Sequence, residues 1–329
     1  MSVEQEGGSG VPVKRQSEVA HLKKVLMKHP RDAFFNDLAI AEQWRQLGYA
    51  RRPDLARASD EMDALVDLLE SHGVRVDFLP PHPETSLDSI YTRDASIVTD
   101  RGIILCNMGK DQRAGEPNAQ AETFEILELP ILGAISGEGR LEGGDFLWLD
   151  KETAVVGRGY RTNPEGIQQL KGLLRATPGE LIVVPLPHWK GPSGVFHLMS
   201  MVSPIDADLV LVFAPLLPIP FREFLLSREF TLVEVPAPEF ETMGCNVLTV
   251  SPRVCVMLEG NPETQRRLEE AGAEVHLYRG NDISVPGMGG PTCLTRPLLR
   301  QVETPVSDSG ADGVIEDGPA EQGGANKNP

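Results

Sequence analysis

The chain has 329 residues, of which 40% are hydrophobic and 24% are charged, so it is long enough to bury a core as one large domain or two smaller ones. Its formal net charge of −17 argues against a nucleic-acid partner and against binding to an anionic membrane surface. The same acidity is compatible with a cationic substrate.

The two ends of the chain differ in composition from the residues between them. Residues 1–17 predict a flexible start and not a signal peptide, and residues 302–329 predict a disordered acidic tail. Residues 18–301 are expected to form a single domain. The most apolar stretch, residues 207–221, is short and interrupted by prolines, so no membrane span is expected. The four cysteines show neither a CxxC pair nor a Cys/His ligand spacing, which argues against zinc and favours reduced thiols in the cytoplasm.

A strand–strand–helix–strand unit recurs along the chain. In chain order, the predicted elements are a helix (57–73) and a strand (74–80), a hairpin (96–106), a hairpin, helix and strand (146–157, 163–176, 180–187), a second such set (199–213, 221–230, 231–236) and a third (246–258, 261–272, 274–280). The hairpins turn near residues 100, 151, 207 and 252. This spacing of roughly 50 residues is typical of repeated architectures.

Units of this kind can each supply a small sheet around a shared axis, with the helices outside. A doubly wound parallel sheet is the alternative, but the hairpins count against it because such folds join successive strands by helices. A radial arrangement would also bring loops from every repeat to one central site.

Polar clusters precede four of the predicted strands, at residues 88–94, 141–146, 195–200 and 287–295. Cys293 in the last cluster supplies a nucleophile, which needs a base and a route to the thiolate. His197 can serve as that base and later as an acid, because the usual pKa of histidine lies near neutrality. Glu142 can hold the imidazole in its working tautomer.

Asp88 and Asp94 add two anions to this set. Paired carboxylates match a planar cation such as guanidinium, which binds them through charge-assisted hydrogen bonds. Together with a thiol and an imidazole, they predict attack on the central carbon of a guanidinium.

Each signal alone also has an ordinary structural interpretation. A cysteine after glycines is often a buried packing residue, and aspartates are common in caps and turns. Among the remaining cysteines, Cys106 and Cys255 lie within predicted strands and are interpreted as core. Cys245, near a strand start, is the competing nucleophile.

Taken together, these motifs resemble the guanidine-modifying (pentein) superfamily, which includes dimethylarginine dimethylaminohydrolases, arginine deiminases and amidinotransferases. The resemblance extends from about Glu18 to Arg300. It implies an α/β fold, a five-bladed α/β-propeller of ββαβ repeats around a central active site. It also implies a Cys–His–acid site formed by Cys293 in PTCLT, His197 in HLMS and Glu142 in EGGD.

The resemblance further implies a set of substrate-binding residues. The acids of DSIYTRD, Asp88 and Asp94, would hold the guanidinium, while Arg113 of QRAGE and Arg161 of GRGYRTNPEG would bind a substrate carboxylate. Arg113 is also compatible with a solvated loop, and Arg161 with bracing a helix start. Met199 stands where deiminases and amidinotransferases carry an Asp, which favours the dimethylarginine hydrolases, whereas YTRD is closer to the deiminases.

The implied reaction is hydrolysis of a guanidino C–N bond of arginine or an Nω-substituted arginine, through a covalent thiouronium, to citrulline and an amine or ammonia. No metal and no organic cofactor is expected, because the thiolate is the nucleophile. The expected partner is a small guanidino substrate with a carboxylate, and a homo-oligomer is left open. Two alternatives remain: an amidinotransferase that uses the same site, and a non-catalytic binding protein built on the propeller.

Overall fold

The structure is a computed structural model that describes residues 16–175, 179–192, 194 and 196–301. The expected flexible start and acidic tail therefore lie outside the described residues, apart from positions 16 and 17. Gln16 is buried, and it exchanges hydrogen bonds with Asp100. The described chain is thus packed two residues before the expected boundary at Glu18.

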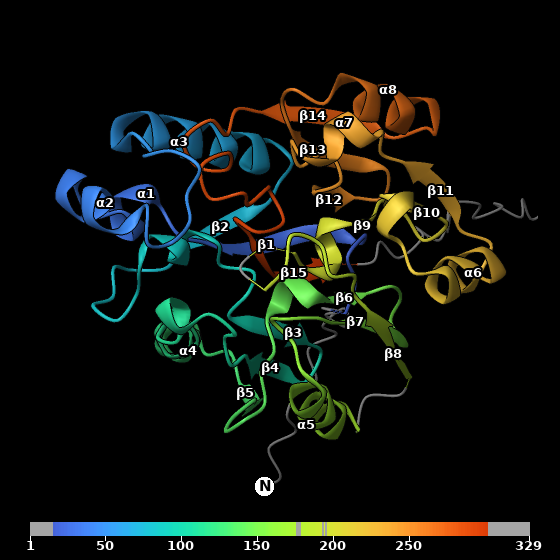
Figure 1. The fold of residues 1–329 in the computed structure, drawn as a ribbon, viewed down its shortest axis with the longest axis horizontal. Helices are drawn as coiled ribbons and strands as arrows, with labels where there is room; N and C mark the ends of the chain where they lie inside the picture. The colour runs from blue at the N-terminus through green and yellow to red at the C-terminus, as the bar shows by residue number, and fades with distance from the viewer. Residues whose placement is uncertain (1–15, 176–178, 193, 195, 302–329) are drawn as a thin grey trace, which may run out of the picture.

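Five three-stranded sheets make up the fold, with the helices toward the outside (Figure 1). The sheets are β15 (Arg296–Gln301), β1 (His21–Met27) and β2 (Arg75–Phe78); β3 (Ser96–Thr99), β4 (Gly102–Leu105) and β5 (Ile131–Ala134); β6 (Phe146–Trp148), β7 (Thr153–Arg158) and β8 (Glu180–Pro185); β9 (Val202–Pro204), β10 (Leu209–Val212) and β11 (Thr231–Glu234); and β12 (Val247–Ser251), β13 (Val254–Leu258) and β14 (Glu274–Tyr278). In every sheet the central strand pairs antiparallel with the first strand named and parallel with the third.

The α-helices are α1 (Pro30–Ala33), α2 (Asp37–Gln43), α3 (Leu55–Ser71), α4 (Glu116–Ile126), α5 (Pro164–Leu174), α6 (Ile219–Ser227), α7 (Ala237–Phe240) and α8 (Pro262–Glu270). In four of the repeats one α-helix (α4, α5, α6 or α8) joins the second and third strands, which is the predicted strand–strand–helix–strand unit, whereas α1, α2 and α3 all lie between β1 and β2. The prediction of an α/β fold with five repeated sheets is confirmed, and the doubly wound alternative is wrong. Within the described residues, none of these helices combines the length and the apolarity that crossing a membrane requires.

Burial separates the inner strands from the outer ones. All residues of β3, β6 and β9 are buried. The outer strands β2, β5 and β8 instead contain exposed positions. In every sheet the first strand has no exposed residue and the third strand has at least one, so a loop that leads into a first strand arrives on the inner side of its sheet.

Two helices begin with the same Asn-Pro-Glu sequence but are capped differently. Asn163 precedes α5, and its side chain accepts a hydrogen bond from the backbone N–H of Gly166, as expected for an N-cap. Asn261 precedes α8, but its side chain makes no such bond. There the Glu239 carboxylate accepts from the N–H groups of Glu263 and Thr264 at 2.8 and 2.7 Å. A distant carboxylate has replaced the local cap, which the sequence pattern does not reveal.

The two ends of the described chain meet in one sheet. β15 pairs antiparallel with β1, with His21 opposite Gln301, and β2 completes the sheet on the other side. Arg300 also donates to the carbonyl of Ala20 at 2.7 Å. The loop that precedes β15 carries Cys293, so this pairing fixes where the thiol lies.

Candidate active site

The candidate site is built from segments that lead into the innermost strands. The 3₁₀ helices η1 (Leu87–Ile90), η3 (Gly143–Asp145) and η4 (Leu198–Ser200) precede β3, β6 and β9. They carry or follow the predicted residues Asp88, Glu142 and His197, while Cys293 precedes β15. The residue directly before β12, Asn246, also belongs to the site, although it lies in none of the predicted polar clusters. Every sheet therefore contributes one segment.

Glu142 holds His197 through a short hydrogen bond. The Nε2 atom of His197 lies 2.7 Å from Oε2 of Glu142, and both side chains are buried. The other carboxylate oxygen of Glu142 accepts from the backbone N–H of Gly109 at 2.9 Å. With Nε2 engaged, the second ring nitrogen, Nδ1, is the one left for chemistry, and it lies 3.8 Å from Oδ1 of Asp94.

The charges around His197 favour its imidazolium form. Burial alone would lower the pKa of His197, but the carboxylates of Asp94, Asp145 and Glu142 raise it to about 9. Burial would likewise raise the pKa of Glu142, but the hydrogen bond and charge of His197 lower it to about 2. At neutral pH the pair is therefore the His197 imidazolium held by the Glu142 carboxylate. The imidazolium can donate a proton from Nδ1.

Cys293 is the one cysteine of the four that is not fully buried. Its sulfur accepts a hydrogen bond from Nδ2 of Asn246 at 3.3 Å, and Oδ1 of Asn246 accepts in turn from Thr292. Burial, together with the nearby Asp94 carboxylate, raises the pKa of the Cys293 thiol, while the Asn246 hydrogen bond opposes that rise. The ligand-free site therefore favours the thiol, and a bound cation would favour the thiolate.

The competing cysteines lack this setting. Burial raises the pKa of Cys255 to about 12, and it raises the pKa values of Cys106 and Cys245 further. Cys245 sits in the core beneath β10, where its sulfur is 4.0 Å from the carbonyl of Leu211. These contacts favour Cys293 over Cys245 as the nucleophile.

Asp94 carries an unpartnered oxygen at the centre of the site. Its Oδ2 accepts from Arg113 at 2.6 Å, whereas its Oδ1, which is buried, has no hydrogen-bond partner among the described residues. A buried carboxylate oxygen without a donor is costly. The N–H of a bound cation would satisfy it.

Arg113 makes contacts that differ from its expected role. Its guanidinium donates to both carboxylate oxygens of Glu116 at 2.8 and 2.7 Å, to Asp94, and to the carbonyl of Tyr91 at 2.9 Å. The group is almost wholly buried. In this structure its donors serve to position Asp94, and they do not favour the expected binding of a substrate carboxylate.

Asp88, the other predicted guanidinium ligand, forms an ion pair with Lys110, which lies outside the predicted polar clusters. The ammonium of Lys110 lies 2.6 Å from Oδ2 of Asp88 and donates to the carbonyl of Leu47 at 2.9 Å. Arg161 is nearby, and its guanidinium donates to Glu142 at the long distance of 3.5 Å. Lys110 and Arg161 are thus the cations of the site whose donors are least used.

These residues line one cavity that is open to solvent. We refer to it as the polar cavity; its lining residues include Asp88, Asp94, Lys110, Arg113, Arg161, His197 and Cys293. A second cavity shares His197 and Cys293 but is walled by Trp189, Phe196 and Phe240. The thiol and the imidazole therefore lie where a polar space and an aromatic space meet.

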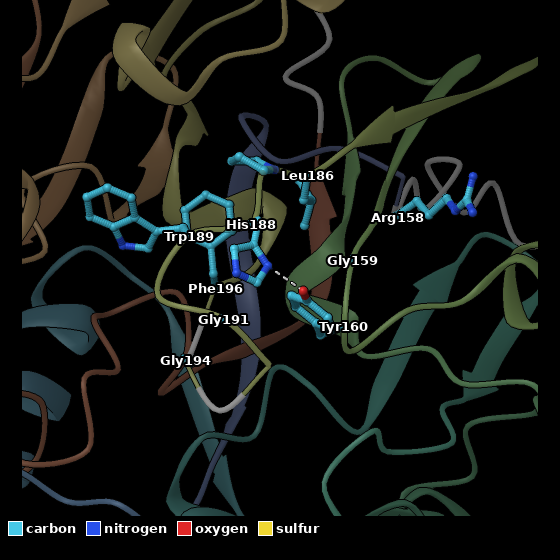
Figure 2. A pocket seen from close by; sticks show the side chains of 10 residues that line it. Arg158, Gly159, Tyr160, Leu186, His188, Trp189, Gly191, Gly194 and Phe196 are labelled. Atoms are coloured by element: carbon cyan, nitrogen blue, oxygen red, sulfur yellow. Dashed lines mark hydrogen bonds between the residues drawn. The ribbon is translucent and has the colours of Figure 1, made fainter.

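A third cavity adjoins the aromatic one through Trp189 and Phe196 (Figure 2). Figure 2 shows Tyr160 and His188 pointing toward one another, with the Tyr160 hydroxyl 2.5 Å from Nδ1 of His188. Tyr160 directly precedes Arg161, so the loop after β7 places one side chain at this outer cavity and the next at the polar cavity.

Asp94, Glu142 and His197 bring oxygen and nitrogen atoms within 4.8 Å of one another, which is close enough to hold a metal ion. Their present hydrogen bonds suggest another use. Asp94 is ion-paired with Arg113, and Glu142 holds His197 and receives the Gly109 N–H. A divalent cation would have to displace these donors, so the cluster fits a proton relay better than a metal centre.

The glycines of the Cys293 loop pack against aromatic and amide side chains. A Cβ atom on Gly287 or Gly289 would lie 2.1 or 2.2 Å from Tyr91, and one on Gly290 would lie 2.5 Å from Asn246. A side chain at these positions would therefore collide with Tyr91 or Asn246, which explains why glycine stands there.

Gly144 gives a direct test of the His197 geometry. A Cβ atom there would lie 2.6 Å from both Asp94 Oδ1 and His197 Nδ1, which is closer than real contacts allow. We expect Gly144→Ala to lower kcat/KM by roughly 10- to 100-fold, because displacing the acid–base group by a fraction of an ångström misaligns it. Steady-state kinetics with thermal unfolding would check this. Gly172→Ala, where a Cβ meets nothing within 4 Å, should leave kcat/KM unchanged; equal losses in both variants would contradict the prediction.

Known proteins are similar to this chain in sequence and in fold. A family model described as N,N dimethylarginine dimethylhydrolase, eukaryotic, matches residues 34–300. The chain is 27% identical over 249 residues to the N(G),N(G)-dimethylarginine dimethylaminohydrolase of Pseudomonas aeruginosa, an alignment that covers 74% of this chain and 89% of that enzyme.

Two solved structures illustrate the shared fold. One is a cysteine-to-serine mutant of the Pseudomonas aeruginosa enzyme complexed with citrulline, with a TM-score of 0.67, 22% identity, and coverage of 85% of this chain and 99% of that one. The other is an amidinotransferase of saxitoxin biosynthesis from Microseira wollei, with a TM-score of 0.71, 15% identity, and coverage of 89% and 98%.

Proposed function

Because the chain belongs to the N,N-dimethylarginine dimethylhydrolase family, within the guanidine-modifying superfamily, we propose that it is a cysteine-dependent hydrolase of guanidino C–N bonds. The first substrates to consider are arginine and Nω-substituted arginines, which would give citrulline and ammonia or an amine. The observation that carries the proposal is that a thiol, an imidazolium and an unpartnered carboxylate oxygen face one cavity.

In the proposed first half-reaction, the unpartnered Oδ1 of Asp94 accepts an N–H of the guanidinium and fixes its plane beside Cys293. The bound cation favours the thiolate, so the thiol releases its proton to solvent, and the sulfur then attacks the guanidino carbon. His197 donates its Nδ1 proton to the nitrogen that leaves as the C–N bond breaks. The product of this step is a thiouronium on Cys293 and a free amine or ammonia.

In the proposed second half-reaction, water adds to the thiouronium carbon and His197 accepts its proton. The C–S bond then breaks, which releases the ureido product and regenerates the thiol. Glu142 stays ionised throughout and holds His197 in place, because its pKa of about 2 lies far below that of the imidazolium.

Product analysis tests the proposal. We expect the purified protein to convert a guanidino acid to one equivalent of ureido product and one of amine or ammonia, measured by colorimetry and mass spectrometry. Adding an amine acceptor such as glycine should not divert the amidino group, since water completes the reaction. Transfer of that group to the acceptor would instead support an amidinotransferase. No ureido product from any guanidino compound would contradict the proposal.

A further inference from the structure

The charges that line the polar cavity are unevenly satisfied. Its two aspartates differ, because Asp94 has an oxygen without a partner whereas Asp88 already carries the ammonium of Lys110 at 2.6 Å. That ammonium also donates to the carbonyl of Leu47. A substrate cation can therefore bind in this cavity at the unpartnered oxygen of Asp94. The second carboxylate, Asp88, is already occupied by Lys110.

Lys110 also retains capacity for an anion. An ammonium has three N–H donors, and Asp88 and Leu47 take two of them. The side chain lines the polar cavity, so its remaining donor is available to a ligand there. Because Asp88 and Leu47 hold the ammonium from two sides, its position is fixed before a ligand binds.

Arg161 lies next to Lys110. A Cβ atom on Gly109, the residue before Lys110, would be 3.0 Å from Cα and 3.3 Å from Cδ of Arg161. The Arg161 side chain thus runs alongside the Gly109–Lys110 backbone, and both cations line the same cavity. Arg113, by contrast, is committed to Glu116, Asp94 and Tyr91.

We propose that Lys110 determines substrate specificity: with Arg161 it binds the substrate carboxylate, and by occupying Asp88 it excludes substrates that carry a free α-ammonium group. The preferred substrate is then an ω-guanidino acid without that ammonium. This inference rests on the proposed function, because it assigns the guanidinium to Asp94 beside Cys293.

Like charges explain the exclusion. The α-ammonium of arginine would find Asp88 already paired with Lys110, so no free carboxylate would receive it, and it would lie beside two cations, Lys110 and Arg161. Juxtaposed like charges disfavour binding strongly in a partly desolvated site. A guanidino acid without the α-amino group brings a cation for the unpartnered oxygen of Asp94 and an anion for the remaining donors of Lys110 and Arg161.

The test compares arginine with 5-guanidinopentanoate, which is arginine without its α-amino group. Turnover of both compounds is measured with the wild-type protein. Equilibrium binding of both is measured by calorimetry with a Cys293→Ser variant. We expect 5-guanidinopentanoate to bind more tightly and to show a kcat/KM at least about tenfold above that of arginine. In Lys110→Met the preference should fall or reverse, because arginine can then place its α-ammonium on Asp88. Lys171→Met, on the exposed side of α5, should leave the preference unchanged.

Several outcomes overturn the assignment. Tighter binding of arginine by the protein with Lys110 intact would do so, as would a Lys110→Met variant that changes binding of both compounds by the same factor. A Lys110→Ala variant serves the same comparison if Lys110→Met does not fold. If 5-guanidinopentanoate binds more tightly than arginine but neither compound is turned over, the result counts against the proposed hydrolysis and not against the role of Lys110. Failure of the proposed function and failure of this inference are therefore distinguishable.

Discussion

Cys293→Ser is expected to reduce turnover by about 10⁴-fold or more while the protein still folds and binds substrate. A serine hydroxyl has nearly the same size and can still accept from Asn246, but it is a far weaker nucleophile than a thiolate. Losses of this size are typical when the nucleophile of a catalytic unit is removed. Single-turnover kinetics with calorimetric binding would measure the two properties separately.

Two further measurements make the assignment to Cys293 specific. Cys245→Ala should keep near-normal kcat/KM and lose only some stability, because its sulfur packs in the core. A haloacetamidine should modify Cys293 alone, detected by peptide mass spectrometry. Full turnover by Cys293→Ser, or an adduct on Cys245, would contradict the assignment.

His197→Gln is the second substitution with a large expected effect, about 10²- to 10⁴-fold in kcat, because proton transfer to the leaving nitrogen and from water both depend on the imidazole. Glutamine can still hydrogen bond to Glu142, so the loss would reflect proton transfer more than packing.

The pH dependence of the wild-type enzyme provides an independent check of this role. The pKa of His197 is raised, to about 9, so the imidazolium is present below that pH and is lost above it. In the substrate complex, where the bound cation favours the thiolate, kcat should therefore fall as the pH rises past about 9. Below that point kcat should increase with pH as the thiol loses its proton. A rate that falls with an apparent pKa near 6.5 would contradict the assigned environment of His197.

The repeated fold was predictable because its signals are local. Each hairpin turn, helix start and apolar strand is encoded within a short stretch, and the roughly 50-residue period makes one repeat reinforce another. The placement of Glu142, His197 and Cys293 followed from the same rule, since each lies directly before an inner strand. Asn246 occupies the equivalent position before β12 and could have been found by that rule.

Other features depend on pairings that no local pattern carries. Lys110 looks like a surface lysine in the sequence, and only the folded chain shows it on Asp88 and Leu47. Arg113 matches a substrate-binding residue in sequence, but in the folded chain its guanidinium donates to the carboxylate of Glu116, three residues later. The start of α8 is capped by the carboxylate of Glu239 and not by Asn261, and this contact too depends on residues that are distant in the sequence. Ion pairs between distant residues follow from the packing of the repeats around one another.

The pairing of β15 with β1 also sets the order in which activity can arise during synthesis. The Arg300–Ala20 contact joins residues 280 positions apart, and the nucleophile lies only a few residues before that closing strand. The repeats made earlier can fold locally as they leave the ribosome, whereas this long-range pairing must wait for the last strand. The proposed acid–base and cation-binding residues are therefore synthesised first and the proposed nucleophile last, so on this proposal the site is completed only when the last strand pairs.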